Sequence, residues 1–375
     1  MLCACRDGSW WRSCRSHVTN RVSCSIRTWD AGFVHASRSN APAHPHDLPD
    51  SDLALVTALQ DAPRASWAAI GRAIGVSAPT ARRRWEAIAE SGAAWATTYA
   101  GFAAGLLFGL AEVRCRPGTV DAVAAALRAH PKIISVTGMT GERDLVLTIL
   151  ADDMAQFRQL IQSWLGTHEA VTAVRSTIVT RMFSDGSRWR AVGPPHDGLL
   201  PTVHESRADG EAASREQWLA ALEVLERDGR ASARELAERL GTSEAHARRV
   251  VRRLVAHGWI QQRIDVSLEQ RMWPHALALW LVVPAARLEA TALQIAGLPM
   301  TRMCAALAGG ASNLYVIVWL RELEDAAPME AELARSLELR VLDRAILLHY
   351  YKRVGHLFDE ENRREGQVSW LAPLP

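Results

Sequence analysis

The sequence of 375 residues is poor in lysine and, beyond its N-terminal segment, in cysteine. Lys132 and Lys352 are the only lysines, so arginine carries nearly all of the positive charge, a bias typical of GC-rich genomes. After Cys24 the only cysteines are Cys115 and Cys304, and two distant cysteines do not form a disulfide framework. We therefore expect a reducing, cytoplasmic location.

The motifs of common enzyme classes are also absent. The sequence has no glycine-rich phosphate loop, no nucleophile elbow and no pair of carboxylates spaced for acid–base catalysis. The net charge is only +2, so any contact with nucleic acid must come from local basic patches. An apolar fraction of 49% and a charged fraction of 22% are typical of a folded protein, and the length suggests about two to four domains.

Residues 1–47 show no helical or strand period and lack the apolar core of a signal peptide. Their cysteines and histidines lack the paired C-x2–4-C spacing of zinc sites. We interpret this segment as disordered or as the result of a misassigned start codon, and we expect neither a metal site nor a cofactor. The zinc ligands of the alternative interpretation would be Cys3, Cys5, Cys14, Cys24, His44 and His46.

Residues 93–111 carry no charge and superficially imitate a membrane span. Gly101, Gly105 and Gly109 even have the small-xxx-small spacing of membrane helix pairs. The stretch is, however, poor in Leu, Ile and Val before Leu106, whereas a span needs about twenty strongly apolar residues. We interpret it as a wing, a linker and the first buried strand, and we expect no contact with a membrane.

An internal repeat is the main feature of the sequence. Residues 60–92 align with residues 226–258 without a gap. Such an ordered match predicts two copies of one structural unit. The identical pairs are Arg64/Arg230, Ala65/Ala231, Ser66/Ser232, Gly75/Gly241, Ser77/Ser243, Ala81/Ala247, Arg82/Arg248, Arg83/Arg249 and Gly92/Gly258.

Each copy of the repeat is expected to form three helices, because its apolar residues recur at spacings of three or four. The second helix begins at Ser66 in copy one and at Ser232 in copy two, where Glu235 completes a capping box. Gly75 and Gly241 follow these helices, where a left-handed residue is favoured. The next helix therefore starts after a tight turn, which is typical of a helix-turn-helix.

The third helix of each copy is capped by Ser77 or Ser243 and is rich in arginine. In a helix-turn-helix this helix enters the major groove, where arginine binds phosphates or guanine. The sequence therefore predicts double-stranded DNA as a partner. The candidate DNA-binding residues are Ser77, Thr80, Arg82, Arg83, Arg84, Ser243, His246, Arg248, Arg249, Arg252 and Arg253.

After each helix-turn-helix, most clearly at residues 259–267, an extended stretch suggests a wing. A β-α-β-β-α-β order of elements follows in both copies, which is the ferredoxin-like split motif. The fold class is therefore α+β, with a winged helix-turn-helix plus a ferredoxin-like domain present twice. The predicted strands are 106–115, 133–137, 145–150, 174–182, 276–283, 303–307, 314–320 and 345–351, and the predicted helices are 120–129, 154–165, 288–296 and 330–337.

These elements give a domain order along the chain. An acidic segment rich in Pro and Gly separates the copies, and the charged C-terminal tail is expected to be a solvated extension. The predicted boundaries are 1–47 for the N-terminal segment, 48–99 and 214–268 for the winged helix-turn-helix units, 104–184 and 274–353 for the α+β domains, 192–213 for the linker and 354–375 for the tail.

This order of domains resembles the Lrp/AsnC family of transcription regulators. The resemblance is carried by the segment from Leu55 to Arg64 that leads into the helix-turn-helix, the Gly-Val-Ser-x-x-Thr turn from Gly75 to Thr80, and the arginines that follow. It covers residues 48–182 and again residues 216–352. The family's α+β domains pair into dimers that assemble further, so the resemblance implies self-association through these domains.

The resemblance also implies a site for a small-molecule effector, such as an amino acid, at a Gly-x-x-Asp turn between strands two and three. The matching residues are Gly141 and Asp144 in copy one and Gly310 and Asn313 in copy two. Asn313 replaces the acid and removes the charge that suits an ammonium group. The alternative is an ordinary β-turn, in which these residues serve backbone geometry only.

We expect a sequence-specific regulator rather than an enzyme. Its two helix-turn-helix units, which we call the reading heads, differ in sequence and suggest an asymmetric operator. Siroheme decarboxylases share this architecture, however, and would need arginines and histidines around a large tetrapyrrole pocket. His130, His168, His349 and His356 are at positions more typical of surface or capping groups. The other alternative is a small-molecule sensor with a degenerate helix-turn-helix that does not bind DNA.

Overall fold

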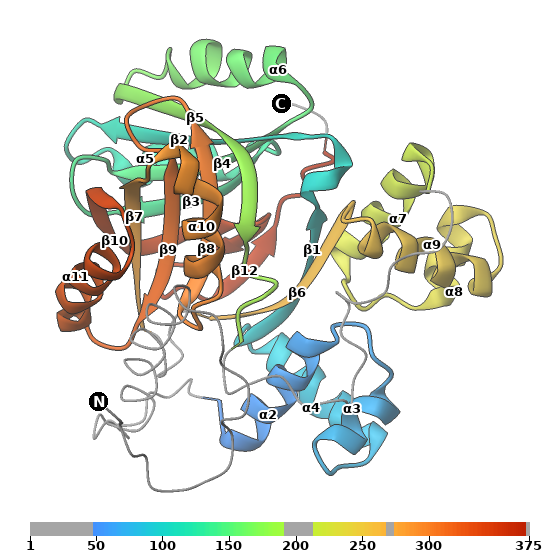
Figure 1. Ribbon diagram of the computed structural model, residues 1–375. Coiled ribbons are helices and arrows are strands. Elements are labelled where there is room, and N and C mark those ends of the chain that lie inside the picture. Colours follow the sequence, from blue (N-terminus) through green and yellow to red (C-terminus); the bar gives the residue numbers. More distant parts are fainter. Residues whose placement is uncertain (1–47, 191–212, 268–273, 373–375) are drawn as a thin grey trace, which may run out of the picture.

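The computed structural model describes residues 48–190, 213–267 and 274–372 (Figure 1). The N-terminal segment and nearly all of the predicted linker therefore lie outside the described residues. Two small helical units lie on one side of the molecule and a larger α+β lobe on the other, with strands β1 and β6 running between them (Figure 1). None of the helices in these ranges is long and apolar enough to cross a membrane.

The two helical units have the three helices that the repeat predicts. The predicted caps are confirmed: the Ser77 and Ser243 side chains accept the backbone N–H of the residue three positions later. Ser232 and Glu235 form the predicted capping box, and Gly241 ends its helix in the left-handed conformation. The helices are α2 (Asp50–Asp61), α3 (Trp67–Ala73), α4 (Ala78–Glu90), α7 (Arg215–Arg227), α8 (Ala233–Leu240) and α9 (Glu244–Ala256).

The extended stretch after each helical unit pairs with its counterpart in the other copy. Strand β1 (Ala94–Ala100) is antiparallel to β6 (Ile260–Val266), and Thr97 lies opposite Arg263. The offset of the repeat, which aligns Gln60 with Glu226, also aligns Thr97 with Arg263. Equivalent residues thus face each other at the middle of the ladder, so the pseudo-twofold axis of the molecule passes through this pair.

The α+β lobe contains the predicted β-α-β-β-α-β order twice. Its helices cover two separate apolar cores, one for each copy. The first copy consists of β2 (Leu107–Cys115), α5 (Val120–Arg128), β3 (Ile133–Met139), β4 (Leu145–Ala151), α6 (Met154–Gln159) and β5 (Val171–Ser184). The second copy consists of β7 (His275–Val282), α10 (Leu288–Ala296), β8 (Thr301–Ala308), β9 (Leu314–Leu320), α11 (Ala326–Ser336) and β10 (Arg340–Arg353).

The last strand of each copy is shared between the two sheets. Strand β5 pairs first with β2 of its own copy and then, from Ile178 onward, with β8 of the other. Strand β10 pairs with β7 and then, from Leu347 onward, with β3. The sheet therefore closes on itself through the two shared strands. Both are longer than their local sequence pattern predicts, because half of each ladder belongs to the other copy.

The prediction of a solvated C-terminal tail is wrong. The chain after β10 forms a hairpin of β11 (His356–Phe358) and β12 (Arg364–Gln367), and β11 pairs with the end of β10. Phe358 is 2% exposed and Trp370 is 4% exposed. The charges that suggested a solvated tail are concentrated in the hairpin turn between the two strands, whereas the apolar residues around them are buried.

Two equivalent arginines join the helical units to each other. Arg64 donates to the backbone oxygens of Gly229 (2.7 Å) and Ala231 (2.7 Å) in the second unit. Arg230 donates in return to those of Pro63 and Ala65 in the first, the latter at 2.8 Å. Burial lowers the pKa of Arg230 to about 10. The exchange fixes the position of one unit relative to the other.

Loss of either arginine should loosen this junction. In Arg64→Ala, two buried carbonyl oxygens lose a charged donor, and we expect the free energy of unfolding to fall by about 2–3 kcal/mol. Urea unfolding followed by circular dichroism measures this change. Arg234, an exposed arginine paired only with Glu238 on its own helix, is the matched control, and Arg234→Ala should cost less than about 0.5 kcal/mol. Equal costs for the two variants would contradict the proposed junction.

One of the only two lysines is buried beneath the C-terminal hairpin. The Lys352 side chain is completely buried, and its Nζ donates to the backbone oxygen of His130 at 3.0 Å. Burial lowers the pKa of Lys352 to about 7, although the nearby Glu226 carboxylate acts in the opposite direction. The charged form is therefore disfavoured in the folded protein.

This burial predicts that stability increases with pH. Between about pH 7 and the ordinary lysine value of 10.5, the unfolded chain binds more protons than the folded one, so raising the pH favours folding. From neutrality to about pH 8.5 we expect a gain of about 1–2 kcal/mol, measured by urea unfolding at each pH. The slope should flatten in Lys352→Met and persist in Lys132→Met. A slope that both variants retain would rule out Lys352 as its source.

Candidate functional site

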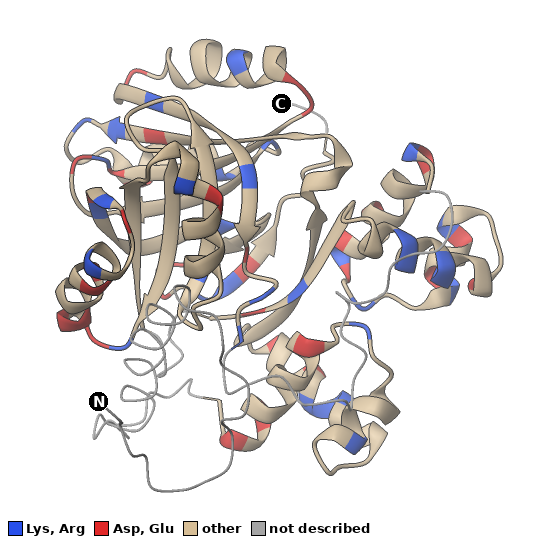
Figure 2. Ribbon diagram, viewed as in Figure 1, with Lys and Arg blue, Asp and Glu red and all other residues tan. Residues whose placement is uncertain are grey.

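The arginines of the third helices face solvent in both helical units. Figure 2 shows basic residues on both units. Arg82 pairs with Glu86 (2.7 Å) and Arg248 with Glu244 (2.6 Å), each within its own helix. The remaining predicted arginines have no ion-pair partner in the described part of the chain: Arg83, Arg249 and Arg252 are exposed, and Arg84 and Arg253 are half-buried.

The polar residues predicted to bind DNA lie at the start of the same helices. The Ser77 Oγ accepts the backbone N–H of Thr80 and lies 2.8 Å from the Thr80 hydroxyl oxygen. Ser243 caps α9 through the backbone N–H of His246. Their hydroxyls thus have a capping role already. Contact of these four residues with DNA stays a prediction.

The predicted effector loop of copy one is a tight turn held by Asp144. The Asp144 Oδ2 accepts the backbone N–H of Cys115 at 2.7 Å, and the Asp144 N–H donates to the Val113 oxygen. Gly141 is exposed and has a φ of +93°, which favours glycine. The carboxylate therefore satisfies a backbone donor of the adjacent strand.

The equivalent loop of copy two has the same geometry with an amide in place of the acid. The Asn313 Oδ1 accepts the backbone N–H of Val283 (2.9 Å) and its Nδ2 donates to the Val283 oxygen (2.7 Å). Gly310 is also in the positive-φ region. Asn313 thus makes two bonds where Asp144 makes one. Effector binding at either loop stays a prediction.

Arg143, within the first loop, connects the two copies and was not predicted from the sequence. Its side chain is 5% exposed and pairs with Glu112 (2.7 Å) of its own copy and with Asp343 of the other. The guanidinium carbon lies 3.8 Å from the centre of the Trp280 ring, a cation–π geometry. The loop is therefore anchored at the interface between the α+β domains.

A cavity of about 250 Å³ lies beside the pseudo-twofold axis, between the β1/β6 ladder and the α+β lobe. Both copies contribute to its wall. Its charged lining consists of Asp185, Arg188, Arg263, Arg302 and Arg353. None of the histidines that the structure describes lines it, so the four histidines considered for a tetrapyrrole site do not meet there.

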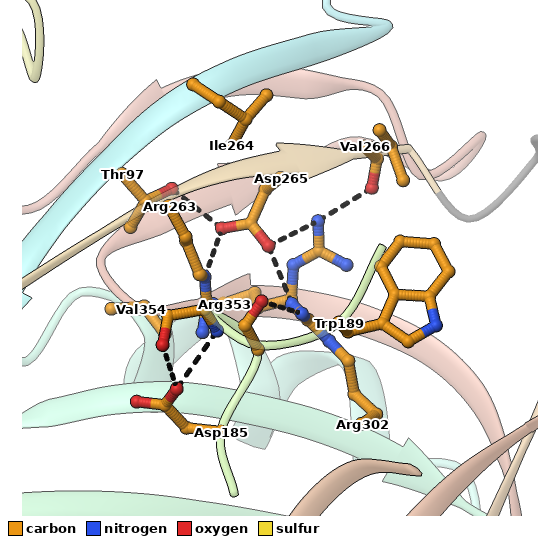
Figure 3. Close-up of polar contacts among 12 residues, drawn as sticks. Thr97, Asp185, Trp189, Arg263, Ile264, Asp265, Val266, Arg302, Arg353 and Val354 are labelled. Carbon is orange, nitrogen blue, oxygen red and sulfur yellow. Dashed lines mark hydrogen bonds and ion pairs between the residues drawn. The ribbon is translucent and has the colours of Figure 1, made fainter. Parts of the chain in front are cut away.

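Asp265 holds the buried arginines of this cavity together (Figure 3). Its carboxylate accepts from Arg263 (2.7 Å) and Arg302 (2.6 Å), and Arg353 lies 3.6 Å away. Thr97 donates a further hydrogen bond of 2.7 Å. Burial alone would raise the pKa of Asp265, but the three arginines hold it well below its ordinary value. We refer to Asp265, Arg263, Arg302 and Arg353 as the arginine cluster.

A second carboxylate closes one side of the cavity. The Tyr99 hydroxyl donates to Asp185 Oδ2 at 2.6 Å, and Ser187 donates to Oδ1 through its backbone N–H (2.9 Å) and its hydroxyl (2.5 Å). Burial raises the pKa of Tyr99 well above its ordinary value. Tyr99 is therefore a neutral donor at physiological pH. The cluster was not predicted from the sequence, in which Arg302, near the start of the mostly apolar strand β8, is only a weak signal.

The geometry of the first loop predicts how Asp144 substitutions behave. Asp144→Asn keeps an acceptor for the Cys115 N–H, as Asn313 does in copy two, and should change the free energy of unfolding by less than about 1 kcal/mol. Asp144→Ala leaves that donor unpaired and should cost about 1–3 kcal/mol. Urea unfolding compares the two. If Asp144→Asn were as destabilising as Asp144→Ala, the backbone role would be excluded; if it removed only an amino-acid-dependent rise in Tm, the carboxylate would be assigned to the effector.

Family profiles match three parts of the chain. The AsnC-type helix-turn-helix domain matches residues 50–87, the Lrp/AsnC ligand-binding domain residues 109–189, and a winged helix-turn-helix DNA-binding domain residues 219–261. A search of curated protein sequences found no significant match.

Solved structures share the architecture at low identity. The siroheme decarboxylase NirDL is 15% identical, with 84% of this chain and 96% of that chain covered and a TM-score of 0.51. The complex of the same enzyme with an iron-uroporphyrin III analogue is also 15% identical, with 81% of this chain and 92% of that chain covered and a TM-score of 0.51. The transcriptional regulator NMB0573 of Neisseria meningitidis, solved with L-Met, is 22% identical, with 41% of this chain and 99% of that chain covered and a TM-score of 0.32. At this identity the decarboxylase likeness shows the fold alone.

The family matches fall on the elements described above. The first two cover the helix-turn-helix and the α+β domain of copy one, and the third covers the helix-turn-helix of copy two. The ligand-binding fold recurs after it as β7 to β10. The chain thus contains the helix-turn-helix and ligand-binding domains of the Lrp/AsnC family of transcription regulators, and both folds occur a second time in its C-terminal half.

Proposed function

We propose that the protein is a sequence-specific DNA-binding transcription regulator whose single chain replaces the homodimer of its family. The observation that supports this most directly is the presence of two recognition helices, α4 and α9, with arginines exposed to solvent. The reciprocal contacts of Arg64 and Arg230 hold the two heads together. A fixed pair of heads suits two half-sites at a defined spacing.

The two heads differ, which favours an asymmetric operator. The turn and first residues of the third helix are Ser77-Ala-Pro-Thr80 in copy one and Ser243-Glu-Ala-His246 in copy two. A homodimer presents identical heads and binds a palindrome, whereas two unlike heads select unlike half-sites. A small molecule bound by the α+β domains, such as an amino acid at the Gly141–Asp144 loop, would act as the effector. Cytoplasmic location and further self-association through these domains complete the proposal.

The first experiment is selection of bound sequences from a random DNA pool at two salt concentrations, with the purified full chain. We expect a motif with two unlike half-sites about one or two helical turns apart. Binding should weaken steeply with salt, because each neutralised phosphate releases counterions. A strictly palindromic motif would contradict the asymmetric arrangement. No enrichment at either salt concentration would exclude the regulator and favour the sensor that does not bind DNA.

Substitution of the exposed arginines should show which of the two helix-turn-helix units contacts DNA. In Arg83→Ala and in Arg249→Ala, we expect weaker DNA binding and a salt slope that is reduced by about one for each lost phosphate contact. Fluorescence anisotropy over a salt series measures both. Arg234→Ala, on α8 of the second helical unit, is the control for a loss of positive charge away from the recognition helix. If all three variants bound equally, the recognition helices would not be the DNA-binding surface.

A tetrapyrrole enzyme of the same architecture is the second candidate, because the arginine cluster lines a cavity between the copies. The carboxylates of a tetrapyrrole would suit buried arginines. The cavity of about 250 Å³ is, however, smaller than the ~300–1,000 Å³ of drug-sized ligand sites. Titration with siroheme distinguishes the two functions: a shifted visible absorption band with stoichiometric binding would favour the enzyme, and an unchanged spectrum the regulator.

A further inference from the structure

The cavity beside the pseudo-twofold axis has a one-sided distribution of charge. Thr97 and Arg263 face each other at the axis. Asp185 and Arg353 also occupy equivalent positions in the two copies. Each directly follows a residue at the same place in a shared strand: Ser184 of β5 pairs with β8, and Lys352 of β10 pairs with β3. In both pairs the arginine comes from copy two, and so does Arg302. Copy two thus supplies the buried positive charge of a wall that both copies share.

The charges around the cavity do not balance. Four arginines line it, namely Arg188, Arg263, Arg302 and Arg353, together with one carboxylate, Asp185. Asp265 lies directly behind them and is shared by the three buried arginines. Arg188 is exposed, so the groups shielded from solvent are three arginines and two carboxylates, which leave a net charge of +1 at a largely buried site. An uncompensated buried charge is costly, so an anion in the cavity would stabilise the fold.

Two polar atoms in the wall have no partner in the described part of the chain. The Arg353 Nε is completely buried, and the Arg353 side chain is 6% exposed. The Ser184 Oγ is also buried without a hydrogen bond, in a residue that is 2% exposed. Buried donors are almost always paired. Both residues line the cavity, so its wall includes polar side chains whose hydrogen-bonding capacity the described protein does not fully use.

Much of the rest of the wall is apolar, although Ser135, Thr137, Thr148 and Gln261 also line it. Phe102 stacks on Phe108 with their ring centres 4.1 Å apart, and both rings line the cavity. Ile134, Met182 and Met303 extend this surface. A ligand that fits must therefore combine an anionic end with an apolar body. Since a cavity of ~150 Å³ holds benzene, the volume of about 250 Å³ corresponds to about ten non-hydrogen atoms.

We propose that this cavity binds a small organic acid, with its carboxylate facing Arg353 and Arg188 and its apolar body against Phe102. A carboxylate accepts two or more charged hydrogen bonds from guanidinium groups. A zwitterionic amino acid, with no net charge, would leave the excess buried charge of +1 in place. The site is separate from the Gly141–Asp144 and Gly310–Asn313 loops. Its role as an effector site rests on the proposed regulatory function, whereas binding of the acid does not.

The test measures Tm and calorimetric binding for the full chain with benzoate and with 4-methyl-2-oxopentanoate at millimolar concentration. Benzamide, a neutral molecule of nearly the same size and shape as benzoate, and leucine, the amino acid with the carbon skeleton of the oxo acid, are the matched comparisons. We expect at least one acid to raise Tm, because a ligand of the folded state stabilises it. Its amide or amino acid counterpart should have no measurable effect.

Arg188, which is exposed and lines the cavity, provides a variant that should fold normally. In Arg188→Gln we expect acid binding to weaken about tenfold, which corresponds to one lost charged hydrogen bond. Arg181 is also exposed, but it pairs with Glu289 and does not line the cavity. Arg181→Gln is therefore the control and should bind the acid like the unaltered protein.

Three results would overturn the assignment: no effect of either acid, equal binding of benzoate and benzamide, or equal weakening in both arginine variants. Siroheme serves as a third ligand, because its side chains present the same carboxylate chemistry. A shifted siroheme band that disappears in Arg188→Gln would replace the small acid with a tetrapyrrole. DNA binding is measured separately, so failure of the regulator proposal and failure of the acid site give different results.

Discussion

The structure depends on two strands that belong to both copies at once. Each ferredoxin-like domain leaves the second strand of its sheet with an open edge, and the last strand of the other copy covers it: β10 pairs with β3 and β5 pairs with β8. An open edge in the middle of a protein would expose a row of unpaired backbone groups. Neither domain completes its sheet alone, so the duplicated chain is one folding unit. The ion pairs of Arg143 and the exchange of Arg64 and Arg230 reinforce a pairing that the strands have already fixed.

Because the two copies lie in one chain, the residues that face each other at the pseudo-twofold axis can differ. In a homodimer the residues facing each other on the twofold axis are identical, and two arginines at that place would repel each other. Here Thr97 faces Arg263, and at equivalent positions two residues further along the strands copy one carries Tyr99 and copy two Asp265. A buried carboxylate can thus collect three arginines on one side without placing a second cluster opposite. The one-sided cavity is a consequence of fusing two copies that then diverged.

The sequence predicts well those features whose cause is local. Ser77, Ser232 and Gly241 mark helix ends because capping depends on residues three or four positions apart, and all three behave as expected. The length of β10 was underestimated because half of its ladder is formed with the distant strand β3. The tail was misjudged because its charged turn dominates a segment that also contains Phe358 and Trp370. The arginine cluster could not be found, since in a chain where arginine carries nearly all positive charge three more arginines give no contrast. Only the fold brings residues 263, 302 and 353 together.

The position of the cavity suggests how a ligand there could reach the reading heads. Strand β1 carries Tyr99 to the cavity wall and β6 carries Arg263, so the two strands that meet at the axis both line the site. Helix α7 packs on β1 and α2 packs on β6, so each strand also supports the helical unit of the opposite copy.

A ligand that draws Arg263 and Arg353 toward its carboxylate would act on both heads through the same ladder. Effectors of this kind change an affinity by about 1–3 kcal/mol, and the effect is reciprocal. A ligand on the surface loops at Asp144 or Asn313 would act by a different route, because these side chains bond to the end of the first strand of their own α+β domain. At the axis, one small molecule can therefore contact both copies, and both the β1/β6 ladder and the α+β lobe.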